Sequence, residues 1–226
     1  MSTAGLVVFD LDGTLIDSSG DLVHAVNATL ARIAPQAPAL PPDRIRSFVG
    51  HGAGTLVERT LAEARLPQRA QDVLPVFLEV YRAHLLDETR LYPGVAEALE
   101  GLDGYRLVVL TNKPGDMSRT ILEGLGVAHR FARVWGPEDA GAKKPDPAGL
   151  RRLMEEAGAG REETAMVGDS AVDVRTGRAA GVLTVGVSYG LDPEGVRAEA
   201  PDVTLDDLRQ LRGHLGRPRP RTSVLP

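Results

Sequence analysis

Short runs of consecutive apolar residues occur near the start of the chain and repeatedly in its second half. The first run covers residues 6–9, and the later segments, which are mostly apolar, cover residues 106–110, 133–135, 164–167 and 183–187. Runs of this length without alternating polar positions are typical of strands buried on both faces of a parallel sheet. The stretches between the later runs have a helical pattern. We therefore expect strands and helices to alternate and to form a parallel α/β sheet.

The segments between these strands carry apolar residues at spacings of three and four, which predicts helices. The expected elements are helices at about 95–102, 117–125, 148–157 and 172–180, an edge strand at 202–204 and a last helix over 205–215. Residues 216–226 are rich in proline and arginine, a composition that predicts a frayed tail.

Residues 17–88 differ from the rest of the chain because they show consecutive helical patterns and no convincing strand. A simple connection between a strand and the next helix takes only a few residues. The segment is therefore expected to be an inserted helical domain. We divide the chain into an α/β core made of residues 1–16 and 89–226, which resembles a Rossmann-like sheet, and a helical cap made of residues 17–88.

The composition narrows the class of protein. The 226 residues carry a net charge of −5 and include no cysteine. The mild acidity argues against nucleic acid or an anionic membrane as a partner, and the lack of cysteine excludes disulfides, thiol nucleophiles and thiolate zinc sites. No signal-peptide pattern opens the chain, and no apolar run approaches the roughly 20 residues of a membrane span. We expect a cytoplasmic globular protein, as a monomer or homodimer, with a small-molecule partner.

Two carboxylates directly follow the first apolar run. Asp10 and Asp12 are two residues apart, and Gly13 and Thr14 open a turn after them. Residues two apart in an extended backbone point to the same side, so both carboxylates should face one pocket. Open α/β sheets bind ligands at the ends of such strands. Because two anions this close repel each other, the pair predicts a nearby cation, a shared proton or a catalytic role.

Three later segments place polar residues where predicted strands end or helices begin. Thr111 and Asn112 follow one strand and open a helix, where backbone N–H groups favour anions. Lys144 stands ahead of a second helix. Asp169 follows another strand, and Asp173 lies one helical turn further on. The carboxyl ends of parallel strands share one edge, so these side chains should meet.

Lysine is rare in this chain and occurs only in its middle. The three lysines are Lys113, Lys143 and Lys144, and arginine supplies all the other basic side chains. A lysine ammonium is a compact point charge that a planar guanidinium does not replace. This distribution favours a functional position for Lys144 over a solvated surface position.

Together these residues supply the parts of a phosphoryl-transfer site. Mg²⁺ commonly binds through a few carboxylates together with substrate phosphate. The reaction needs a nucleophile, neutralisation of the equatorial oxygens and protonation of the leaving group. The set therefore predicts a Mg²⁺-dependent enzyme that acts on a small phosphorylated metabolite.

The order of the motifs resembles that of the haloacid dehalogenase superfamily. The matching segments are Asp10-x-Asp12-x-Thr14, Thr111, Lys144-Pro145 and Gly168-Asp169-Ser170-x-x-Asp173. Within the superfamily the chain is similar to the phosphoglycolate phosphatase type, on the segments 49–53, 56–59, 111–114 and 187–190. His51 departs from that type, in which a smaller polar residue such as asparagine is expected.

The resemblance implies a covalent mechanism. Asp10 is expected to attack phosphorus and to form an aspartyl-phosphate. Asp12 is expected to protonate the leaving oxygen and then to activate water against the intermediate. Mg²⁺ is expected between the Asp10 carboxylate, the backbone carbonyl of Asp12 and Asp169.

The resemblance also assigns the groups that bind phosphate. Thr111, the backbone of Asn112 and Lys144 are expected to hold the phosphoryl oxygens. Thr14 and Asp173 are expected to support the site, with Asp173 steadying either Lys144 or a metal-bound water.

The helical cap is expected to close over the site and to exclude water. Its glycine-rich loop at 50–54 is the expected specificity element. His51 and Arg59 are our candidates for reading a second anionic group on the substrate.

The expected reaction is hydrolysis of 2-phosphoglycolate to glycolate and phosphate. Other small phosphomonoesters, such as sugar phosphates and N-acetylmuramate 6-phosphate, are alternative substrates. A non-catalytic phosphometabolite-binding protein is a third alternative, because a fold does not determine a function. Such a protein would be expected to have lost Asp10, Asp12 or Lys144, and this chain retains all three.

Overall fold

The computed structural model describes residues 5–216, and all but the first residue of the predicted tail at 216–226 lies outside the described residues. One six-stranded sheet forms the centre of the molecule, in the order β5-β4-β1-β6-β7-β8, and all of its neighbouring strands are parallel. The strands are β1 (Leu6–Phe9), β4 (Arg106–Leu110), β5 (Arg133–Trp135), β6 (Thr164–Gly168), β7 (Leu183–Val187) and β8 (Val203–Leu205). The predicted parallel α/β fold is confirmed.

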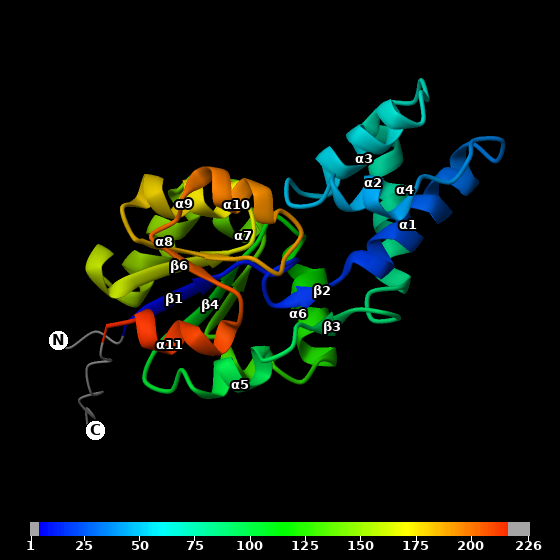
Figure 1. Cartoon of the computed structure of the whole chain (residues 1–226). Helices are drawn as coiled ribbons and strands as arrows, with labels where there is room; N and C mark the ends of the chain where they lie inside the picture. Colours follow the sequence, from blue (N-terminus) through cyan, green and yellow to red (C-terminus); the bar gives the residue numbers. More distant parts are fainter. Residues whose placement is uncertain (1–4, 217–226) are drawn as a thin grey trace.

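Helices cover both faces of this sheet (Figure 1). The helices of the α/β core are α5 (Val95–Glu100), α6 (Gly115–Gly124), α7 (Pro137–Ala140), α8 (Ala148–Ala157), α9 (Ala171–Ala180), α10 (Pro193–Glu199) and α11 (Leu211–His214). Short 3₁₀ turns occur at Ala128–Arg130, Arg161–Glu163 and Leu208–Gln210.

The central strand β1 shows why a strand at the centre of this sheet is an unbroken run of apolar residues. Val7 and Phe9 point into the core beneath α5, α6 and α11, whereas Leu6 and Val8 point into the core beneath α8. Successive side chains of a strand face opposite sides, so a sheet covered on both faces needs apolar residues at every position. All four residues of β1 are buried.

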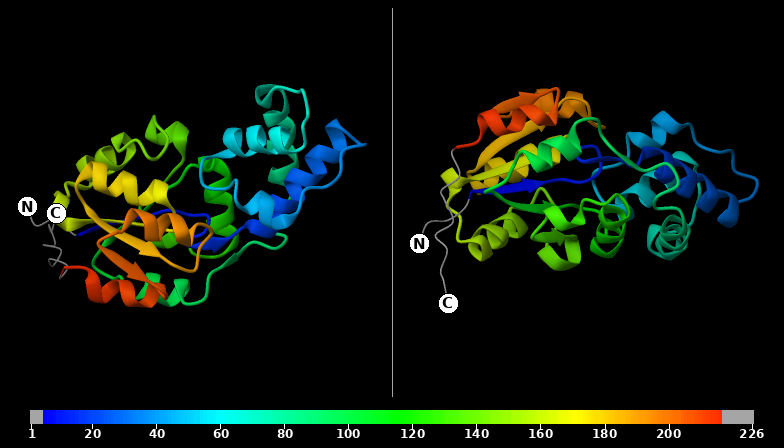
Figure 2. Two further views of the ribbon diagram at one scale, coloured as in Figure 1. Left: turned by 45° about the horizontal axis from the view of Figure 1, so that its top comes forward. Right: turned by 90° about the horizontal axis from the view of Figure 1, so that it is seen from below.

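The insert between β1 and α5 forms a helical group beyond one end of the sheet, as both views in Figure 2 show. Its helices are α1 (Ser19–Ile33), α2 (Pro42–Arg46), α3 (Ala53–Glu63) and α4 (Ala70–Ala83). Helix α4 packs against both α1 and α3. Its apolar stripe buries Val73, Phe77 and Tyr81, which accounts for the helical spacing seen in the sequence.

The chain passes between core and insert through a small ribbon that the sequence did not predict. Strands β2 (Ile16–Asp17) and β3 (Arg90–Leu91) pair antiparallel at the two crossings. The buried carboxylate of Asp21 ties the crossings together, because it accepts hydrogen bonds from the backbone N–H groups of Glu88 and Thr89 and from the Thr89 hydroxyl.

The C-terminal part differs from the sequence prediction. The predicted helix over 205–215 is wrong at its start, because Leu205 ends strand β8 and helical structure begins only at Leu208. The Asp207 carboxylate accepts a hydrogen bond from the Arg209 amide and so marks where the helix begins. Helices α7 and α10 lie in segments for which the sequence predicted no helix. Among the described residues, no helix combines the length and the apolar character needed to cross a lipid bilayer.

Candidate active site

The register of the central strands brings the predicted site residues to one edge of the sheet. Phe9 pairs with Val109 of β4 on one side and with Val167 of β6 on the other. Asp10 continues β1, and its backbone N–H donates to the Val167 carbonyl at 2.9 Å. Thr111 and Asp169 follow the neighbouring strands just beyond these pairs. Parallel strands thus place residues from distant parts of the sequence around one point.

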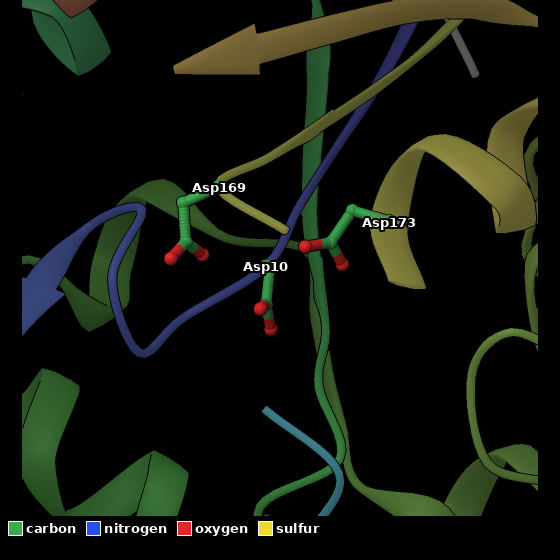
Figure 3. Close-up of side chains that lie close together, drawn as sticks. All are labelled: Asp10, Asp169 and Asp173. Atoms are coloured by element: carbon green, nitrogen blue, oxygen red, sulfur yellow. The ribbon is translucent and has the colours of Figure 1, made fainter. Parts of the chain in front are cut away.

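Three buried carboxylates meet at this point (Figure 3). One oxygen each from Asp10, Asp169 and Asp173 lies within 4.8 Å of the others. The three residues are 6%, 2% and 1% exposed, respectively. This group of side chains could hold a metal ion.

Glycines allow the chain to close tightly around Asp169. Gly13 has a φ of +88°, and a Cβ at this position would lie 2.1 Å from Oδ2 of Asp169. A Cβ on Gly190 would lie 2.2 Å from the Asp169 Cβ. Asp169 itself accepts hydrogen bonds from the Thr14 hydroxyl at 3.0 Å and the Leu191 amide at 2.8 Å. Thr14 therefore contacts Asp169, and its supporting role stays a prediction.

Lys144 joins two of the three carboxylates. Its Nζ lies 2.8 Å from Oδ1 of Asp10 and 2.6 Å from Oδ1 of Asp173. Burial alone would lower the pKa of Lys144, but the two carboxylates outweigh it and hold the pKa above its usual range. The ammonium is therefore charged at neutral pH.

Asn112 holds the Lys144 segment in place. Its side-chain amide donates to the Lys144 carbonyl at 3.0 Å, and its Oδ1 accepts from the Lys144 N–H at 2.9 Å. The same amide donates to the Gly50 carbonyl of the insert at 3.0 Å. The side chain of Asn112 thus connects the end of β4, the lysine loop and the insert, a role that the sequence did not reveal.

Burial raises the pKa of two of the clustered carboxyls. Burial, with a further contribution from Asp173, raises the pKa of Asp10 to about 6 against the lowering effect of Lys144. Burial and the charges of Asp173 and Asp10 raise the pKa of Asp169 well above its usual value. Three carboxylates face one ammonium here, so the site has an excess of negative charge that a divalent cation would neutralise.

Asp12 lies apart from the carboxylate cluster. Its Oδ1 accepts hydrogen bonds from the Ser18 hydroxyl at 2.5 Å and from Lys113 Nζ at 2.9 Å. Lys113 Nζ also lies 2.5 Å from the Tyr81 hydroxyl of helix α4. The sequence alone indicated no role for Ser18, Lys113 or Tyr81. The rarity of lysine was the one signal that pointed to Lys113.

A pocket lies between the sheet edge and the insert. The core contributes Asp10, Asp12, Thr111, Asn112, Lys113 and Pro114, and the insert contributes Leu22, Val49, Gly50, Gly52, Ala53, Leu56, Phe77, Leu78 and Tyr81. The candidate nucleophile and the candidate acid–base group therefore open into a cavity that is mostly apolar on its insert side.

Neither of the two predicted specificity residues is among the residues that line this pocket. His51 is exposed and lines a second hollow, which it shares with Asp12 and Asp169. Arg59 is half-buried on α3 and is not among the residues that line the pocket beside Asp10. Their assignment stays a prediction.

The fold and the site together define a hydrolase with a parallel α/β core, an Asp-x-Asp motif at the end of its central strand and a helical insert. The chain belongs to the haloacid dehalogenase-like hydrolase family, whose sequence profile matches residues 7–187. The predicted family is confirmed.

Full-length relatives point to one branch of this family. The chain is 41% identical to the phosphoglycolate phosphatase of Rhodospirillum rubrum, over 95% of this chain and 92% of the relative. It is 37% identical to the phosphoglycolate phosphatase of Mesorhizobium japonicum, over 91% and 92% of the two chains. A crystal structure from Haemophilus somnus, described as a predicted phosphoglycolate phosphatase, superposes with a TM-score of 0.87 at 30% identity and covers 95% of this chain and 99% of that one.

Proposed function

We propose that this protein is a phosphomonoester hydrolase that cleaves 2-phosphoglycolate to glycolate and phosphate. The observation that carries the proposal is the arrangement around Asp10, a buried carboxylate that opens into a pocket and contacts the Lys144 ammonium. The names of the full-length relatives support the choice of substrate.

The first step is attack of an Asp10 carboxylate oxygen on phosphorus. The bond from phosphorus to the ester oxygen breaks, and Asp12 gives its proton to the departing glycolate oxygen. Thr111, the Asn112 backbone and Lys144 hold the phosphoryl oxygens and stabilise their charge. The product of this step is an aspartyl-phosphate on Asp10.

The second step releases phosphate. Asp12, now ionised, accepts a proton from water as the water oxygen attacks phosphorus. The bond between phosphorus and the Asp10 oxygen breaks, and the free carboxylate returns. Asp12 alternates between acid and base, a role that fits its position beside rather than within the buried carboxylate cluster.

The donor set around Asp10 fits a magnesium ion. Asp10, the backbone carbonyl of Asp12 and Asp169 would hold it, and Asp173 would steady Lys144 through their 2.6 Å contact. When bound, Mg²⁺ would neutralise the charge on the phosphoryl oxygens and the clustered carboxylates. All-oxygen donors and the excess of negative charge among the three buried carboxylates support this choice of cation.

The helical insert acts as a cap in this proposal. Its apolar residues form much of the pocket wall, and the hydrogen bond from Asn112 to the Gly50 carbonyl joins it to the site. A closed cap excludes bulk water from the phosphoryl group before the ester bond is cleaved.

Phosphate release from a panel of small phosphomonoesters, with and without Mg²⁺, tests the proposal. The panel contains 2-phosphoglycolate, sugar phosphates and N-acetylmuramate 6-phosphate. We expect Mg²⁺-dependent turnover and a kcat/KM for 2-phosphoglycolate at least about a hundredfold above the others, which corresponds to about 2.7 kcal/mol of transition-state discrimination. A different preferred ester would replace the substrate. A lack of turnover on every ester would favour the binding-protein alternative.

A further inference from the structure

Lys113 is a buried cation that lines the pocket, and the proposed mechanism assigns no role to it. Its side chain is 4% exposed, and it follows strand β4 two residues after Thr111. Its ammonium donates one hydrogen bond to the Asp12 carboxylate and one to the Tyr81 hydroxyl. The ammonium also lies 4.5 Å from the centre of the Tyr81 ring. Because an ammonium has three N–H donors, one remains for a further partner.

The pocket has a distinctive distribution of charge. Among the described residues that line it, Lys113 carries the one positive charge, whereas Asp10 and Asp12 are both acidic. Lys144 contacts Asp10 from outside this lining and is paired with Asp173. The two lysines therefore lie in different parts of the site. Lys144 lies at the phosphoryl centre, and Lys113 lies in the pocket interior next to the insert.

The insert side of the pocket offers apolar contacts to the rest of a substrate. Leu22, Leu56, Phe77 and Leu78 contribute to the wall near Tyr81. An anionic group on the substrate would lose its hydration here and would need a charged partner in exchange. Lys113, supported by the Tyr81 hydroxyl, offers that partner at the junction of core and insert.

We propose that Lys113, together with the Tyr81 hydroxyl, is the specificity-determining pair that binds the carboxylate of the substrate while Asp10 attacks its phosphate. The inference rests on the proposed function and deepens it, because it explains how the pocket selects a phosphate ester that carries a second, acidic group. It also places specificity at a residue of the core that contacts the insert, rather than at His51 or Arg59.

A pair of substrates that differ only in the second anion tests the inference. In 2-phosphoglycolate the carbon bonded to the ester oxygen carries a carboxylate, and in ethyl phosphate the same carbon carries a methyl group. The quantity to measure is the ratio of kcat/KM for 2-phosphoglycolate to kcat/KM for ethyl phosphate. Any displacement of Asp12 would affect both esters, so it would leave this ratio unchanged. Lys113→Met removes the charge at similar length. Lys143→Met, at the exposed lysine that precedes Lys144, is the matched control.

We expect Lys113→Met to lower this ratio at least thirtyfold, mainly through KM for 2-phosphoglycolate, and Lys143→Met to change it less than threefold. Tyr81→Phe keeps the ring, removes the hydroxyl and should lower the ratio three- to tenfold. It provides the second test should Lys113→Met fail to fold. Equal losses on both esters, or an unchanged ratio in Tyr81→Phe with Lys113→Met unfolded, would overturn the inference.

The same measurement separates this inference from the proposed function. A wild-type enzyme that cleaves ethyl phosphate as well as 2-phosphoglycolate would overturn the role of Lys113 and leave the phosphomonoesterase in place. A wild-type protein that cleaves neither ester, nor any other member of the panel, would overturn both.

Discussion

The ammonium of Lys144 lies 2.8 Å from the carboxylate of Asp10, and the side chains are only 2% and 8% exposed. A charge pair removed from water in this way is stabilising only when its geometry and its other hydrogen bonds are well matched. Asp173 contributes a second carboxylate to the ammonium, and Asn112 holds the backbone of Lys144 in position. Small changes at these positions should therefore have large effects.

Replacing Lys144 by arginine should cripple the enzyme although the charge is kept. The guanidinium is larger and planar, and the buried space between Asp10 and Asp173 is occupied by a compact ammonium. We expect kcat/KM for 2-phosphoglycolate to fall at least about a hundredfold, or about 2.7 kcal/mol. Lys143→Arg, at the exposed neighbour, serves as the control and should stay within threefold of wild type. Near wild-type kinetics in Lys144→Arg would contradict the assignment.

Asp10→Asn should abolish turnover and preserve the fold. Asparagine has nearly the same volume as aspartate but lacks the nucleophilic carboxylate. We expect kcat to drop by a factor on the order of a thousand or more, with an unchanged far-ultraviolet circular dichroism spectrum. Asp206→Asn, an exposed aspartate beyond strand β8, should keep wild-type turnover. Substantial residual activity in Asp10→Asn would exclude this residue as the nucleophile.

The raised pKa of Asp10 predicts how the stability of the metal-free protein depends on pH. The pKa is about 6 in the folded protein, against an ordinary value of 3.8, chiefly because of burial. The folded state binds the proton of Asp10 more tightly than the unfolded state does. The contribution of Asp10 to the free energy of unfolding therefore falls as pH rises from about 4 to 6 and stays low above pH 6. Over this pH interval, the free energy of unfolding of the wild type should fall by on the order of 2 kcal/mol relative to that of Asp10→Asn. Urea unfolding in EDTA at several pH values measures the difference, and parallel pH curves for the two proteins would refute it.

Asp169→Asn should weaken magnesium binding. The substitution removes one of the three clustered charges but leaves an oxygen that can accept hydrogen bonds from Thr14 or Leu191. We expect the dissociation constant for Mg²⁺, measured by calorimetry, to rise at least about tenfold, and the Mg²⁺-induced increase in melting temperature to shrink accordingly. Asp206→Asn provides the charge-matched comparison. Equal affinities in the two variants would place the cation elsewhere.

Gly13→Ala should damage the site more than its backbone strain alone explains. Gly13 has a φ of +88°, and the added Cβ would lie 2.1 Å from Asp169 Oδ2. Gly126→Ala is the matched control, because Gly126 has a φ of +77° with no heavy atom within 4 Å of the added Cβ. The control should cost about 1 kcal/mol of stability. Gly13→Ala should cost more and should reduce kcat/KM at least about a hundredfold, and equal effects of the two substitutions would show that the contact with Asp169 is unimportant.

Several parts of the fold could be predicted because their signal is local. The predicted bounds of strands 106–110, 133–135 and 183–187 agree with those observed, because mostly apolar segments of this length are typical of strands in a sheet that is covered on both faces. The helices of the insert followed from apolar spacing in the same way. By contrast, the β2–β3 ribbon consists of two short strands separated by the whole insert, and so brief a pairing has no pattern of its own.

The site shows the same division. The sequence predicted Asp10, Asp12, Lys144, Asp169 and Asp173 as site residues, because their chemistry and their places after predicted strands or before predicted helices are visible along the chain. It assigned no role to Lys113, whose partners Asp12 and Tyr81 are 101 and 32 residues away. It also placed the specificity residues at His51 and Arg59, neither of which lines the pocket beside Asp10.

The sequence by itself determined the parallel α/β core, the helical insert, the family and the candidate site residues around Asp10. Each of these depends on hydrophobic spacing within one element or on a short motif that ends a strand. The tertiary structure alone decided which side chains of the insert meet the core, and hence the contact of Tyr81 with Lys113 and of Gly50 with Asn112. Those contacts depend on how the insert packs against the core, and that geometry results from many weak interactions between residues far apart in the chain.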